Sequence, residues 1–122
     1  MASTISLVLI VEDEPLVREL AVAAIQDAGF DVVEAANAQE AIDILNHRSD
    51  IGVLFTDVDM PGKLDGLGLA QLVHEQWPAI RLVLTSGRSL LGPMPEDGQF
   101  VAKPYSLQHL ADTLTQVADQ ED

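Results

Sequence analysis

Residues 51–57 read Ile51-Gly-Val-Leu-Phe-Thr-Asp57, in which an apolar run over Ile51–Thr56 ends on an acid. A short, continuous apolar run is typical of a strand that is covered on both faces, as in a parallel sheet. Four similar segments lie elsewhere in the chain, at Leu7–Val11, Val32–Ala35, Ile80–Thr85 and Phe100–Val101. The sequence therefore predicts five strands.

Helical signals separate these strands. They are Pro15 and Gly29 at the ends of a first helix, Asn37 with Glu40 at the start of a second, Pro78 after a third and Ser106 before the last. The first helix stacks Leu16, Leu20, Ala24 and Ala28 at i, i+4 spacing. Glycine and prolines interrupt residues 87–98, so we expect the helix before the fifth strand to be shortened or absent.

Strands that alternate with helices predict an α/β fold, a doubly wound five-stranded parallel sheet of the flavodoxin-like order 2-1-3-4-5. In this order, strands 1 and 3 flank the switch point, where ligands bind beyond the carboxyl ends of the strands. The 122 residues suffice for one domain, which we expect to span 1–122 with a core of about residues 5–118.

The composition excludes several functions. Twenty acidic and six basic residues give a net charge of −14, which repels the phosphate backbone of nucleic acids. No apolar run approaches the roughly 20 residues of a membrane span. The chain has no cysteine, so thiol chemistry and disulfides are absent. The first residues lack the basic charges of a secretion signal, and we expect a cytoplasmic protein.

Three acids follow the two strands at the switch point. Glu12 and Asp13 come after the first strand and Asp57 after the third. Each alone could be a helix cap or a loop acid, but together they would repel one another unless a cation joined them. An all-oxygen cluster suits Mg²⁺.

Other polar groups end the neighbouring strands. Lys103 follows the fifth strand and supplies a cation, while Thr85 and Ser86 close the fourth with hydroxyls that can donate to a phosphate oxygen. Ser86 precedes Gly87, so ordinary turn chemistry is the alternative for its hydroxyl.

Four motifs lie at strand ends in this order: Val8-Leu-Ile-Val-Glu12-Asp13-Glu14, Thr56-Asp57-Val-Asp59-Met60-Pro61-Gly62, Leu84-Thr85-Ser86-Gly87 and Lys103-Pro104. Together they resemble the receiver domain of bacterial two-component response regulators. Tyr105 after Pro104, with Thr85-Ser86-Gly87, resembles in particular its stand-alone, single-domain type. The resemblance runs from residue 5 to about residue 118. The loop over Met60–Gly66 is longer, and the interval from Thr85 to Lys103 shorter, than in typical members.

The resemblance implies that Asp57 accepts a phosphoryl group from a sensor histidine kinase, a phosphotransfer protein or acetyl phosphate. Glu12, Asp13, Asp57 and the main-chain carbonyl of Asp59 would hold Mg²⁺. Lys103 would pair with the phosphoryl oxygens.

The resemblance also implies a set of responding residues. Thr85 would move toward the phosphoryl group with Ser86 as a further contact, and Phe100 would change rotamer, unless it is an ordinary core residue of its strand. The Lys103–Pro104 peptide would be cis.

Such a domain is a signalling switch that catalyses only its own phosphorylation and dephosphorylation, and it relays its state to a downstream protein that the sequence does not identify. Its oligomeric state is open. A phosphate sink and a receiver excised from a hybrid kinase are alternatives. Asp57-Val-Asp59 also resembles the DxD motif of haloacid-dehalogenase-type phosphatases, and Glu12 with a later DxD resembles Toprim domains. The first needs a longer chain, and the charge of −14 argues against the second.

Overall fold

The computed structural model describes residues 7–60, 64–87, 98–103 and 105–119. Its strands are β1 (Leu7–Val11), β2 (Asp31–Ala35), β3 (Val53–Asp57), β4 (Arg81–Ser86) and β5 (Gln99–Ala102). Its helices are α1 (Pro15–Asp27), α2 (Ala38–His47), α3 (Gly66–Gln76) and α4 (Leu107–Asp119). All strand pairs are parallel, and the order β2-β1-β3-β4-β5 confirms the predicted topology.

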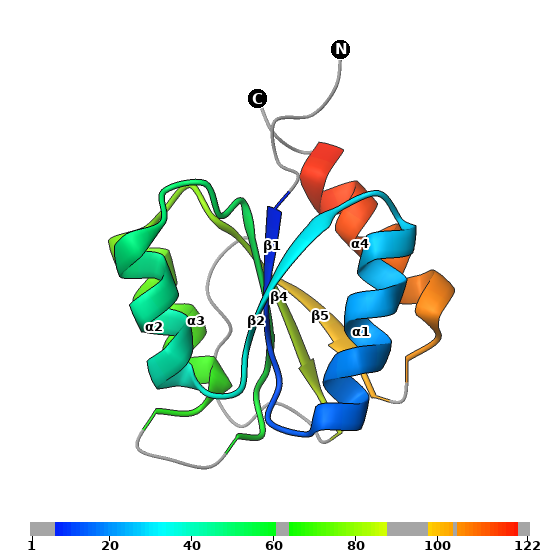
Figure 1. The fold of residues 1–122 in the computed structure, drawn as a ribbon, viewed down its shortest axis with the longest axis horizontal. Coiled ribbons are helices and arrows are strands. Elements are labelled where there is room, and N and C mark those ends of the chain that lie inside the picture. The colour runs from blue at the N-terminus through cyan, green and yellow to red at the C-terminus, as the bar shows by residue number, and fades with distance from the viewer. Residues whose placement is uncertain (1–6, 61–63, 88–97, 104, 120–122) are drawn as a thin grey trace.

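Helices cover both faces of the sheet. Helices α2 and α3 lie on one face, and α1 and α4 lie on the other (Figure 1). Side chains of β3 alternate between two separate cores: Leu54 packs under α2 and α3, whereas Val53 and Phe55 pack under α1 and α4. All five residues of β3 are buried, which explains why its sequence is apolar at successive positions.

Local signals set several helix ends. Asn37 Oδ1 accepts from the amide of Glu40 at 2.8 Å, as the capping-box spacing predicts. Asp65 caps α3 in the same way through the amide of Gly68. Gly29 has a φ of +100°, a conformation that glycine adopts without steric cost, and the chain turns there from α1 into β2.

Of the i, i+4 stripe on α1, only Ala24 is buried in the core. Ala21, Ala24 and Ile25 are buried against the sheet, while Leu16 and Leu20 are 75% and 58% exposed. The helical period marks a stripe but does not say which stripe faces the sheet. Small residues at Ala21 and Ala24 let α1 pack closely against the sheet.

Two boundary details bear on the site. The third strand begins at Val53 rather than Ile51, and Asp57 is its last residue rather than the residue after it. The expectation that the helix before β5 is shortened or absent falls on residues 88–97, which lie outside the described residues. None of the helices described here is long and apolar enough to cross a membrane.

Candidate functional site

Three carboxylates converge at the carboxyl edge of the sheet. Glu12 follows β1 and Asp57 ends β3, and each is only 3% exposed; Asp13 is half-buried. One carboxylate oxygen from each residue lies within 4.8 Å of the others. Parallel strands place their carboxyl ends at one edge, so residues far apart in sequence meet there.

Lys103 joins two of these acids. Its Nζ donates to Asp57 Oδ2 at 3.0 Å and to Glu12 Oε1 at 3.2 Å. The residue follows β5, and its amide continues the sheet pairing by donating to the Ser86 carbonyl at 2.9 Å. A half-buried ammonium between two buried carboxylates compensates charge that would otherwise be costly to bury.

The backbone at the end of β3 is tightly held. The amide of Asp59 donates to Asp57 Oδ1 at 2.9 Å, so the two carboxylate oxygens of Asp57 have different partners. The amide of Val58 donates to the Thr85 carbonyl at 2.8 Å. A Cβ added at Gly66 would overlap the carbonyl oxygen of Asp57, so α3 begins directly against this peptide.

The loop between β1 and α1 is fixed by a residue that the sequence analysis did not single out. Arg18 Nη1 donates to the main-chain carbonyl of Glu12 at 2.7 Å, and its Nε lies 3.2 Å from Glu34 Oε1. The amide of Glu14 donates to Glu12 Oε2 at 3.2 Å. The sequence offered one signal for Arg18, which is that it is the basic residue of α1 in an acidic chain. Its partners Glu12 and Glu34 depend on the fold and could not be read from the sequence.

The surroundings of Glu12 make it a weaker acid than a solvated glutamate. Burial raises the pKa of Glu12 to about 7, and the nearby charge of Asp57 adds to this, against the opposing effects of the Glu14 amide and Lys103. Burial alone would lower the pKa of Lys103, but the hydrogen bonds and charges of Asp57 and Glu12 outweigh it and raise this pKa. A divalent cation would relieve the repulsion, and the oxygen-only donor set fits Mg²⁺.

The residues that end β4 differ in their contacts. Thr85 is buried, and its Oγ1 has no hydrogen-bond partner within the described part of the chain. Ser86 is also buried, and its hydroxyl donates to Asp59 Oδ2 at 2.6 Å. The sequence predicts a phosphate contact or ordinary turn chemistry for this hydroxyl, and neither reading includes the pairing with Asp59.

The remaining predicted residues lie near β5. Phe100 pairs with Leu84 in the sheet and is 37% exposed, so it is not an enclosed core residue. Pro104 lies outside the described residues, and with it the predicted cis peptide. Tyr105 packs edge-on against Phe55 with ring centroids 6.1 Å apart, and burial is the main cause that raises the pKa of its hydroxyl.

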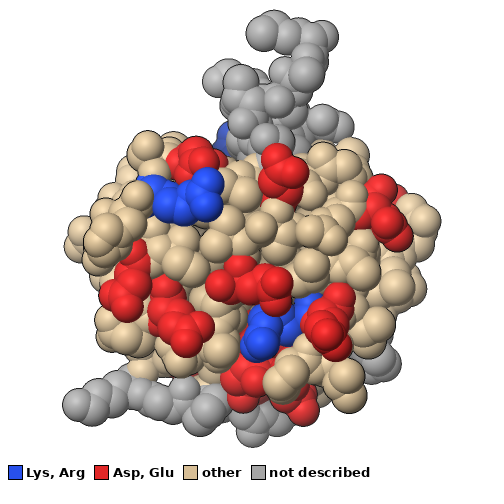
Figure 2. Space-filling view, in the orientation of Figure 1, with Lys and Arg blue, Asp and Glu red and all other residues tan. Residues whose placement is uncertain are grey.

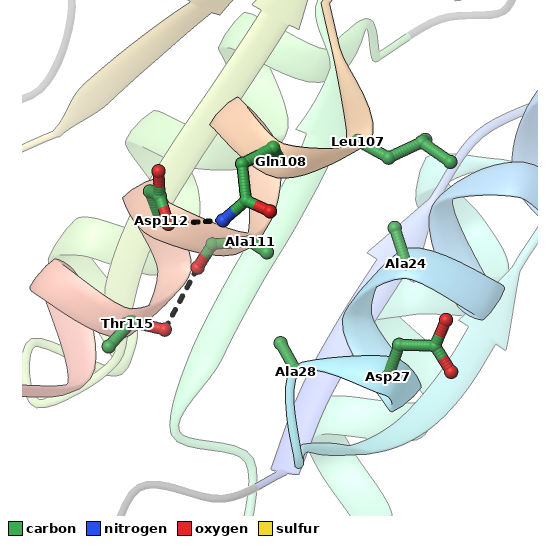
Figure 3. Close-up of a pocket in the computed structure, with 8 residues that line it drawn as sticks. All are labelled: Ala24, Asp27, Ala28, Leu107, Gln108, Ala111, Asp112 and Thr115. Atoms are coloured by element: carbon green, nitrogen blue, oxygen red, sulfur yellow. Dashed lines mark hydrogen bonds between the residues drawn. The ribbon is translucent and has the colours of Figure 1, made fainter.

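One hollow of the surface lies away from this edge and contains none of the predicted site residues. It has a volume of about 350 Å³ and lies between α1 and α4 (Figure 3). Its lining residues are Ala24, Asp27, Ala28, Leu107, Gln108, Ala111, Asp112 and Thr115. Acidic side chains are scattered over the face in Figure 2 rather than gathered in one patch, as expected for a solvated acidic surface.

The fold and the site together define a class of protein, the receiver-type α/β signalling domain with an acidic pocket beside a lysine. A family model described as the response regulator receiver domain matches residues 8–115. The chain therefore belongs to the receiver domain family of two-component systems.

Relatives of known name agree with this. The chain is 34% identical to "Sensor kinase CckA" of Brucella abortus (strain 2308) over 94% of its own length and 13% of that protein. It is 36% identical to "Response regulator Rre1" of Synechocystis sp. (strain PCC 6803) over 90% of its length and 50% of that protein. The chain thus spans half or less of these curated relatives.

Solved structures share the fold. The receiver domain from the hybrid histidine kinase CckA superposes with a TM-score of 0.80 at 30% identity, covering 93% of this chain and 99% of that one. A response regulator receiver protein from Sinorhizobium medicae WSM419 has a TM-score of 0.87 at 23% identity, with coverage of 96% and 97%. The second likeness concerns the fold alone.

Proposed function

We propose that this receiver domain is a phosphoacceptor switch in which Asp57 takes a phosphoryl group from a sensor histidine kinase or a phosphotransfer protein with the help of Mg²⁺. One observation carries the proposal. The carboxylate of Asp57 is buried between two further acids and a lysine that reaches it at 3.0 Å. Members of the family typically bind Mg²⁺ at such an acidic pocket.

The metal would be held by Glu12, Asp13, Asp57 and the main-chain carbonyl of Asp59. When bound, Mg²⁺ supplies positive charge that neutralises the acids and the incoming phosphoryl oxygens. An oxygen of Asp57 forms the new bond to phosphorus while the bond from phosphorus to the donor nitrogen breaks, and the donor imidazole keeps the electron pair and takes up a proton. Lys103 stabilises the charge of the transferred group from the other side.

Residues on β4 and β5 near Asp57 are the candidates that respond to its phosphorylation. Thr85 has a buried hydroxyl without a partner among the described residues, which supports a contact with the phosphoryl group once it arrives. Phe100 lies on β5, next to β4, and is 37% exposed, so the core does not enclose its ring. Ser86 as a phosphate contact and a cis peptide before Pro104 remain predictions.

The protein acts as a signalling domain rather than as an enzyme on a separate substrate. Because the chain belongs to the receiver domain family, we no longer consider a haloacid-dehalogenase-type phosphatase or a Toprim domain as its function. We infer that residues 1–122 form one receiver domain, that it lies in the cytoplasm, and that it passes its state to another protein. The chain matches a part of a protein that is named as a sensor kinase, so a receiver that belongs to a hybrid kinase is a second candidate. A phosphate sink is a third candidate.

Intact mass spectrometry after incubation with acetyl phosphate and Mg²⁺ tests the proposal. We expect the wild type to gain one phosphoryl group, and neither the Asp57→Asn variant nor the wild type in EDTA to gain it. Circular dichroism checks that Asp57→Asn is folded. An unmodified wild type, or equal modification of Asp57→Asn, would contradict the acceptor assignment.

A further inference from the structure

The position of Asp59 is tied to the acceptor through its main chain and to β4 through its side chain. Its amide donates to Asp57 Oδ1 at 2.9 Å, so a shift of this peptide would turn the acceptor carboxylate. Its carboxylate oxygen Oδ2 accepts from Ser86 Oγ at 2.6 Å and from the amide of Gly87 at 3.3 Å. One residue therefore connects the end of β4 to the acceptor.

Ser86 is well placed to act as an anchor. It is 2% exposed and is the last residue of β4, and its carbonyl accepts from the amide of Lys103 at 2.9 Å. Its backbone therefore lies in the ladder next to the lysine, while its side chain reaches the loop after β3. A hydrogen bond from a hydroxyl to a carboxylate is charge-assisted and stronger than one between neutral groups.

The same hydroxyl cannot serve two acceptors at once. A serine has one proton to donate, and here it lies toward Asp59 rather than toward Asp57. Contact between Ser86 and a phosphoryl oxygen would require this short bond to break. The observed geometry favours the anchoring role over direct contact with the phosphoryl group.

We propose that Ser86 and Asp59 form a positioning pair, in which the hydroxyl of Ser86 holds the Asp59 carboxylate and so keeps the Asp59 amide on the acceptor carboxylate. The proposal rests on the proposed function insofar as Asp57 is the phosphoacceptor. It adds that the side chain of Asp59 sets the reactivity of Asp57 without touching the phosphoryl group.

Two readouts on the purified 122-residue chain test the pair. The first is hydrogen exchange of the Asp59 amide by NMR without a phosphoryl donor, and the second is the rate of phosphorylation by acetyl phosphate with Mg²⁺. We expect Ser86→Ala and Asp59→Ala each to speed exchange of this amide and to slow phosphorylation about tenfold, the effect of losing one charge-assisted bond. The double variant is expected to be no slower than either single variant.

Matched variants separate positioning from other effects. Asp59→Asn keeps an oxygen for Ser86 to donate to but loses the charge that strengthens the bond, so its amide protection and rate are expected to lie between those of the wild type and of Asp59→Ala. Thr115→Ala removes a hydroxyl whose bond is to Ala111 within α4, and it is expected to change neither readout. Similar losses in Asp59→Asn and Asp59→Ala would overturn the proposal.

The two hypotheses fail in different ways. Rates that multiply in the double variant would show that Ser86 acts on the phosphoryl group independently of Asp59, and unchanged amide protection in Ser86→Ala would also overturn the pair. If the wild type takes up no phosphoryl group, the acceptor assignment fails, and the exchange data on unphosphorylated protein alone decide whether Ser86 holds the Asp59 amide.

Discussion

Lys103 Nζ lies 3.0 Å from Asp57 Oδ2 and so joins the end of β5 to the end of β3 across the intervening strand β4. Because the same ammonium reaches Glu12 at 3.2 Å, a single cation balances two buried acids in the metal-free protein. Its removal leaves both carboxylates without this partner.

The first prediction concerns that removal. Lys103→Ala is expected to keep Mg²⁺ binding, because a more negative pocket attracts the ion, and to be stabilised by Mg²⁺ more strongly than the wild type is. Thermal melts over a series of Mg²⁺ concentrations measure this. A weaker Mg²⁺ effect in the variant would show that Lys103 is needed to build the site.

The same variant tests the response of β5. Beryllofluoride, a stand-in for the phosphoryl group, is expected to shift the NMR signals of the Phe100 ring in the wild type and much less in Lys103→Ala. Equal shifts in the two proteins would show that Lys103 does not couple the acceptor to Phe100.

The second prediction is a pH dependence that arises from Glu12. Its pKa is raised from 4.5 to about 7 in the fold, so the folded, metal-free protein binds a proton that the unfolded chain has released. Stability without metal is therefore expected to fall as the pH rises from about 4.5 to about 7 and to level off above that. Mg²⁺ affinity should rise over the same window, because the ion competes with the proton.

Melts in EDTA and in Mg²⁺, recorded below, within and above this window, check the second prediction. Glu12→Gln is the control: it removes the titrating group, so the part of the pH dependence due to Glu12 should disappear. If the wild type and Glu12→Gln show the same slope, Glu12 does not titrate with the raised pKa.

The third prediction uses the close approach of α3 to the acceptor. Gly66→Ala would place a Cβ on the carbonyl oxygen of Asp57, which is backbone and cannot yield cheaply, so we expect a loss of about 2–3 kcal/mol in the free energy of unfolding. Phosphorylation by acetyl phosphate should slow as well, because Asp57 must shift. Urea unfolding and intact mass measure the two effects.

Gly68→Ala is the matched control on the same helix. Its Cβ would meet mainly Leu64 Cδ1, the far end of a flexible side chain, and alanine favours the helix by up to about 1 kcal/mol over glycine. The expected change is small. A loss as large as that of Gly66→Ala would mean that helix packing in general, rather than contact with Asp57, causes the effect.

The fourth prediction separates the two contacts of Arg18. Arg18→Ala loses the bond to the Glu12 carbonyl and is expected to cost about 1–2 kcal/mol of stability. Glu34→Gln loses only a partly exposed ion pair and should cost less than about 0.5 kcal/mol. Urea unfolding measures the free energy of unfolding of both variants. Equal losses would show that the bond from Arg18 to the Glu12 carbonyl is not the more stabilising of the two contacts.

The sequence sufficed to predict the strand order, because apolar runs such as Leu7–Val11 and Ile51–Thr56 must be buried on both faces. It also placed Glu12, Asp13, Asp57 and Lys103 at one edge, because parallel strands end together. These conclusions depend on topology, which tolerates errors of one or two residues at strand ends.

Details set by side-chain orientation were not predictable in this way. The helical period of α1 allowed two apolar stripes, and the structure buries Ala21, Ala24 and Ile25 while it leaves Leu16 and Leu20 exposed. The partner of Ser86 likewise depends on loop positions to within an ångström. The spacing of residues in the sequence does not tell whether the Ser86 hydroxyl donates to Asp59 or to a phosphate.

The order of the strands has a consequence for how such a switch can diversify. Asp57 ends the central strand; its fellow acids come from the β1 side, whereas Thr85, Ser86 and Lys103 come from the β4 and β5 side. Under the proposed function, Glu12 and Asp13 on the first side set how the metal is held, whereas Thr85 on the second side sets how the domain answers. Metal binding and response can therefore be tuned separately around an acceptor that stays unchanged.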